Sequence, residues 1–136
     1  MEIQFAVPGL PRGKGRPRFS RSGHPYTDEK TRDYEMYIVL CYRAAHGAFR
    51  FPDTAFLSVH TTAYFPIPKS ASRAQRAEME SGRILPARKP DVDNIEKAVL
   101  DALNGIAYKD DARVCMTGCR KYYGREPGLV ITIREV

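Results

Sequence analysis

The feature that most constrains the fold is the spacing of apolar residues between positions 94 and 104. Apolar side chains recur there at intervals of three and four residues, at Ile95, Ala98, Val99, Ala102 and Leu103. This spacing is typical of an α-helix that buries one face. Asn104 and Gly105 follow directly, and such residues commonly end helices. The segment therefore predicts an amphipathic helix whose apolar face packs against another element.

Strand-like segments flank this helix. An apolar–polar alternation typical of half-buried strands marks residues 2–7 and 57–65, and the residue types at 112–123 and 129–135 also favour strands. The glycine-rich and proline-containing stretch at 124–128 predicts a turn that pairs the last two strands as a closing hairpin. A further helix is predicted from Thr27, a favourable N-cap residue, to about Gly47, and residues 70–81 favour a short polar helix.

The order of these elements, β-α-β-(α)-α-β-β, predicts the fold class. It indicates an α/β (α+β) fold in which helices pack on one face of a mixed sheet, as a single domain over residues 1–136. No apolar run approaches the length that spans a bilayer, and the N-terminus lacks a signal-like pattern. We therefore expect a cytoplasmic protein without a membrane partner, whose three cysteines (Cys41, Cys115 and Cys119) are free thiols.

The charge distribution favours a polyanionic partner. The formal net charge is +6, and basic residues gather in two runs that contain no acid. The runs are Arg12, Lys14, Arg16, Arg18 and Arg21, and then Arg83, Arg88 and Lys89. Either run taken alone is equally well explained as a solvated surface loop. Together, with the second run directly before a group of acids, they indicate a nucleic-acid-binding surface.

The acids form the most informative motif. Asp91 and Asp93 are two residues apart, so in an extended segment their carboxylates would project to the same side. Hard cations such as Mg²⁺ prefer this kind of oxygen ligand, and a third carboxylate would come from Asp110 or Asp111. Lys97, four residues after Asp93, would reach the same place on a helix.

Structural explanations exist for the same residues. Asp93, followed three residues later by Glu96, resembles a capping box and would then only cap the helix. Asp110 and Asp111 would only be turn residues, and Lys97 only an exposed partner of Asp101. The acids considered jointly, with basic residues directly before them, favour a functional site.

Two stretches carry a family resemblance. KPDVDNIEKAVLDALNGIAYKDDARV, from Lys89 to Val114, resembles the core motif of RusA-type Holliday junction resolvases. KGRPRFSRSGHPYTDEKTRDYE, from Lys14 to Glu35, is similar to the N-terminal region of their phage and prophage branch. The resemblance implies an endodeoxyribonuclease, dependent on Mg²⁺ or Mn²⁺, that resolves four-way DNA junctions as a homodimer during recombination and repair.

The resemblance also implies roles for individual residues. Asp91, Asp93 and Asp111 would be the metal-binding catalytic carboxylates, with Asp110 as the alternative third ligand, and Lys97 would be an active-site lysine. The expected DNA-binding residues are Lys14, Arg16, Arg18, Arg88 and Lys89. Two alternatives stay open: a nuclease for flaps or other branched DNA, and a basic nucleic-acid-binding module without catalysis.

Overall fold

A computed structural model describes residues 1–15 and 18–136. Its main sheet contains the strands β1 (Glu2–Pro8), β4 (Leu57–Pro66), β5 (Val114–Gly124) and β6 (Gly128–Glu135). The helices are α1 (Glu29–His46), α2 (Arg73–Glu80) and α3 (Val92–Leu103), with a short 3₁₀ turn, η1, at Asp111–Arg113. A second, two-stranded sheet joins β2 (Arg18–Phe19) to β3 (Pro25–Tyr26). The predicted α+β class and mixed sheet are confirmed.

The strand order of the main sheet is β1-β6-β4-β5. β6 pairs antiparallel with both β1 and β4, while β5 pairs parallel with β4. The predicted closing hairpin is therefore wrong, because β4 lies between β5 and β6. Residues 125–127 cross the end of β4 instead. Three extended residues span about 10 Å, which matches two strand spacings of about 4.8 Å each.

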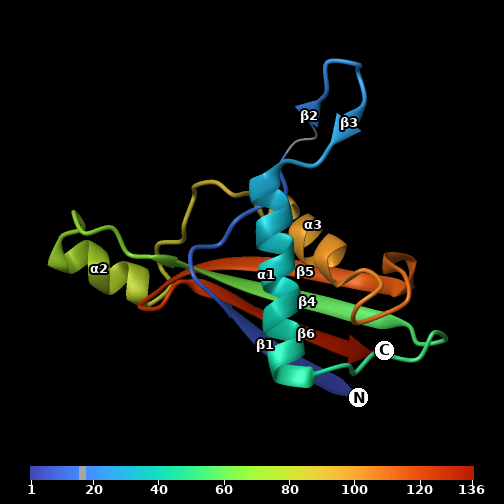
Figure 1. The fold of residues 1–136 in the computed structure, drawn as a ribbon. Coiled ribbons are helices and arrows are strands. Elements are labelled where there is room, and N and C mark those ends of the chain that lie inside the picture. Colours follow the sequence, from blue (N-terminus) through green and yellow to red (C-terminus); the bar gives the residue numbers. More distant parts are fainter. Residues whose placement is uncertain (16–17) are drawn as a thin grey trace.

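Helices α1 and α3 cover one face of this sheet, whereas α2 lies beyond the strand ends (Figure 1). Along β4 the side chains of Val59, Ala63 and Phe65 are buried, whereas His60 between them is exposed. Figure 1 shows α1 and α3 side by side across the sheet, and the apolar face predicted for α3 is fully inside the core. Among the described residues, no helix is both long and apolar enough to cross a membrane.

Helix boundaries differ slightly from the prediction at two important places. α1 is capped by Asp28, whose carboxylate accepts a hydrogen bond from the Thr31 amide at 2.7 Å, rather than by Thr27. α3 begins at Val92 with Asp91 at the N-cap, so Asp93 already lies in the first helical turn. The expectation that Asp91 and Asp93 share an extended segment is therefore wrong. The short polar helix is confirmed as α2, with a capping box at Ser72.

The loop after β1 is held tightly between α1 and α3. The Lys14 amide donates to the Asn94 carbonyl at 2.9 Å, and the Gly15 amide donates to the Thr31 hydroxyl at 3.1 Å. A Cβ atom on Gly13 would lie 2.8 Å from the Cβ of Asn94, so only glycine permits this approach. Beyond the loop, the β2–β3 hairpin, which was not predicted, projects past the start of α1 (Figure 1).

Candidate functional site

Asp91 and Asp93 lie exposed at the N-terminal end of α3. Although Asp91 occupies the N-cap position, its side chain makes no capping hydrogen bond. The positive end of the helix dipole stabilises negative charge at this place. Both carboxylates are thus turned to solvent and are not used as helix caps, which leaves their oxygens free to bind a cation.

A second pair of acids lies at the opposite end of α3. Asp110 caps η1, because its carboxylate accepts a hydrogen bond from the Ala112 amide at 2.9 Å, and this bond lowers the pKa of Asp110. The Asp111 amide donates to the side chain of Asn104 at 3.1 Å. A hydrogen bond with the neighbouring Asp110 carboxyl raises the pKa of Asp111. The two carboxyls are therefore close neighbours beyond the C-terminal end of α3.

The length of α3 separates the two acid pairs. Asp93 and Asn104, the contact of Asp111, are eleven residues apart, which is about 16 Å along a helix axis. Within the described ranges 1–15 and 18–136, no three acid, histidine or cysteine side chains gather closely enough to hold one metal ion. Each pair by itself fits Mg²⁺, which usually takes one or two carboxylates and completes its shell with water and phosphate oxygens.

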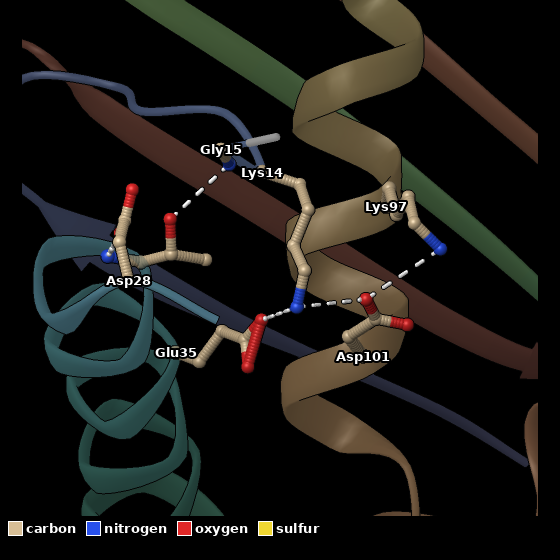
Figure 2. Close-up of polar contacts among 7 residues, drawn as sticks. Lys14, Gly15, Asp28, Glu35, Lys97 and Asp101 are labelled. Atoms are coloured by element: carbon tan, nitrogen blue, oxygen red, sulfur yellow. Dashed lines mark hydrogen bonds and ion pairs between the residues drawn. The ribbon is translucent and has the colours of Figure 1, made fainter. Parts of the chain in front are cut away.

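An ion network connects the loop, α1 and α3. Lys14 Nζ lies 2.6 Å from Glu35 Oε1 and 3.2 Å from Asp101 Oδ2, and Lys97 Nζ lies 3.7 Å from the same Asp101 oxygen. Figure 2 shows Asp101 between the two lysines, with Glu35 approaching from α1. Lys14 is a bridge between two helices, a contact that the sequence reasoning missed because Glu35 is distant along the chain.

The two lysines of this network differ in how far their side chains are buried. The Lys14 side chain is 17% exposed, whereas the Lys97 side chain is 63% exposed. Burial lowers the pKa of Lys14, but hydrogen bonds and charge from Glu35 and Asp101 outweigh it, and the pKa ends above its ordinary value. Lys14 is thus a fixed internal cation, while the ammonium of Lys97 faces solvent and remains accessible to a ligand.

The other predicted DNA-binding residues occupy different surroundings. Arg18 lies on β2 with its side chain 67% exposed and 3.8 Å from Asp28. The guanidinium of Arg88 lies over the Phe65 ring, 5.8 Å from its centroid. Lys89 is exposed beside the start of α3, and Arg16 lies outside the described residues. Of these predicted residues, Arg88 and Lys89 are the ones that precede the Asp91–Asp93 pair directly in the chain.

Comparison with known proteins defines the class to which this fold and site belong. The family model of endodeoxyribonuclease RusA matches residues 8–134, nearly the whole chain. The chain belongs to the RusA endodeoxyribonuclease family. It is also 37% identical over 142 residues to the uncharacterized protein YqaN of Bacillus subtilis (strain 168), and the match covers 98% of this chain and 96% of YqaN.

Proposed function

We propose that this protein is a metal-dependent endodeoxyribonuclease that resolves four-way (Holliday) DNA junctions by paired symmetric nicks, in recombination and repair. The observation that carries the proposal is the Asp91–Asp93 pair, which is exposed at the start of α3 and makes no cap. It lies inside the stretch matched by the endonuclease family, and the basic residues Arg88 and Lys89 come just before it in the chain.

The chemistry proposed is hydrolysis of a phosphodiester bond. A divalent cation, Mg²⁺ or Mn²⁺, would be held by Asp91 and Asp93, with Asp111 or alternatively Asp110 as the further ligand. When bound, it lowers the pKa of a water and stabilises negative charge on the phosphate and the departing oxygen. Lys97 projects from the same helix one turn after Asp93 and would neutralise charge on the phosphate. Asp101, tied to the buried Lys14, would limit the positions that Lys97 can take.

The separation of the two acid pairs supports a homodimer. About 16 Å of helix axis separates Asp93 from Asn104, whose side chain accepts from the Asp111 amide, and among the described residues the two acid pairs form no single group of three ligands. In a two-fold symmetric dimer, the second chain can present its Asp110–Asp111 pair to the Asp91–Asp93 pair of the first. The same symmetry provides two equivalent sites, which suits a substrate that must be cut twice.

The substrate assignment is tested by comparing DNA structures. We expect Mg²⁺ or Mn²⁺, but not EDTA, to support cleavage of a synthetic four-way junction, with symmetric nicks in opposing strands. A flap, a three-way branch and a plain duplex that share the junction's arm sequences serve as matched substrates. Faster cleavage of the flap or the branch than of the four-way junction would contradict the resolvase assignment and favour a different branched-DNA nuclease.

The non-catalytic alternative makes a different prediction. A basic binding module would bind the junction strongly and with steep salt dependence, but would cut no substrate with any divalent cation. The side chain of Asp91 makes no capping hydrogen bond at the start of α3. This argues against the alternative, because a module that used this acid only as a helix N-cap would show that bond.

A further inference from the structure

A cavity of about 390 Å³ opens beside the candidate site, between the N-terminal loop and the first turns of α1 and α3. Its wall includes the cations Arg12, Lys30 and Lys89, all exposed, together with Tyr34 of α1. None of these three cations lies within 4 Å of a carboxylate among the described residues, in contrast to Lys14 on the same wall. The cavity wall therefore carries three cations without a salt bridge to the described part of the chain, beside one carboxylate, that of Asp28.

Tyr34 gives this cavity a feature that a solvated basic surface lacks. The residue is only 9% exposed, yet its hydroxyl has no hydrogen-bond partner among the described residues. The Arg12 amide lies near enough to influence the hydroxyl but does not meet hydrogen-bond geometry. A buried polar group without a protein partner costs free energy unless a molecule from outside the fold satisfies it, so this hydroxyl is available to a ligand.

The hydroxyl is suited to donate to an anion. Burial raises the pKa of Tyr34 to about 12, although the neighbouring Arg12 opposes the shift, so the group stays protonated at neutral pH. Asp28 also lines the cavity, but its carboxylate already accepts from the Thr31 amide and lies 3.8 Å from Arg18. An anion in the cavity would thus meet a neutral donor and unpaired cations.

We propose that this cavity is a second phosphate subsite, which binds a backbone phosphodiester of the DNA strand next to the one at Asp91 and Asp93. The Tyr34 hydroxyl donates to a phosphate oxygen, and Arg12, Lys30 and Lys89 neutralise the charge. Pro90 and Asn94 line the same cavity and flank the acid pair, so the two positions are contiguous on the protein surface. The proposal rests on the proposed function for the identity of its ligand, but it concerns binding and not cleavage.

Junction binding in EDTA tests the subsite without any cutting. Tyr34→Phe should weaken binding about tenfold, which is the value of one hydrogen bond to a charged group, and should leave the slope of affinity against salt unchanged. Arg12→Gln, Lys30→Gln and Lys89→Gln should each reduce that slope by about 0.7 to 0.9, the contribution of one phosphate contact. Arg50→Gln, at the opposite end of α1, serves as the charge control and should have a smaller effect.

Tyr42→Phe is the matched control for the tyrosine. The Tyr42 hydroxyl donates to the Phe49 carbonyl at 2.5 Å, so its removal should lower thermal stability and leave junction affinity unchanged. Tyr34→Phe should show the reverse, with unchanged or higher thermal stability and weaker binding. Wild-type affinity in Tyr34→Phe, or a loss of stability equal to that of Tyr42→Phe, would overturn the proposal.

Inorganic phosphate distinguishes a strand-binding site from a site for the free anion. At constant ionic strength, phosphate should displace the junction no better than sulfate. Specific displacement by phosphate that Tyr34→Phe abolishes would assign the cavity to the free ion and overturn the proposal. A protein that cuts no DNA but shows the predicted binding pattern would refute the nuclease function alone, whereas a nuclease indifferent to Tyr34 would refute the subsite alone.

Discussion

Replacing Lys14 with methionine should cost the protein far more stability than the same change at Lys97. Both ammonium groups contact Asp101, at 3.2 Å and 3.7 Å, but Lys14 also contacts Glu35 and is mostly buried. Lys14→Met would leave Glu35, 18% exposed, without a cation, and Asp101, 25% exposed, with only the solvent-exposed Lys97. Removing one partner of a fully buried ion pair costs about 3–5 kcal/mol. Discounted for the remaining exposure, we expect about 1–2 kcal/mol for Lys14→Met.

The exposed pair provides the matched comparison. Lys97→Met removes one surface contact in the same network and should change the free energy of unfolding by about 0.5 kcal/mol or less. Urea denaturation of both variants, fitted with a common slope, measures the difference. Equal stability of the two variants would refute the reasoning. So would a Lys14→Met protein of wild-type stability that binds DNA weakly, because Lys14 would then face the substrate and not Glu35.

The pH dependence gives an independent check of the same contact. Because the pKa of Lys14 is raised in the folded protein, its stabilising contribution is complete below its ordinary value of 10.5 and is lost as pH rises through the raised value. The stability difference between wild type and Lys14→Met should therefore shrink above pH 10.5. A difference that stays constant from neutral pH to strong alkali would contradict the buried ion network.

Three further predictions concern residues outside this network. Gly13→Ala should destabilise the protein by about 1–3 kcal/mol in thermal or urea unfolding, because the added Cβ would meet the Asn94 Cβ at 2.8 Å. A thiol reagent at pH 8 should modify the exposed Cys115 quickly and Cys119 slowly, since burial raises the pKa of Cys119 to about 11; persistence of the fast phase in Cys115→Ser would contradict this. Arg113→Lys should lower stability by about 1–2 kcal/mol, because the guanidinium donates to two backbone carbonyls and lies over an aromatic ring; wild-type unfolding would show that lysine replaces these contacts.

The sequence predicted those parts of the fold that depend on local periodicity. The helix α3 and its buried face follow from the recurrence of Ile95, Val99 and Leu103, because burial on a helix repeats every three to four residues. The four strands of the main sheet were placed to within two residues by their alternation or by their β-favouring residue types. The strand order could not be predicted from the sequence. The short connection at 125–127 is compatible either with direct pairing of β5 and β6 or with a crossing over the end of β4.

The candidate site was predicted in its residue types more than in its geometry. Asp91 and Asp93 were singled out by their proximity in sequence, but a helix boundary two residues earlier than expected changes their relative direction. The separation of Asp93 from Asp111 depends on the full length of α3, which the motif alone does not convey. The internal position of Lys14 depends on Glu35, and charge runs in a sequence do not distinguish a buried cation from an exposed one.

The most direct test of the central claim is single-turnover cleavage of a four-way junction in Mg²⁺ by the wild type, Asp91→Asn and Asp93→Asn, with junction binding measured in EDTA. Glu126→Gln, an exposed acid between β5 and β6, is the control for loss of one carboxylate. We expect the wild type and the control to nick opposing strands, and both aspartate variants to bind normally but cut about a hundredfold more slowly or not at all. Wild-type cleavage by Asp91→Asn and Asp93→Asn would contradict the assignment of this acid pair as the catalytic centre.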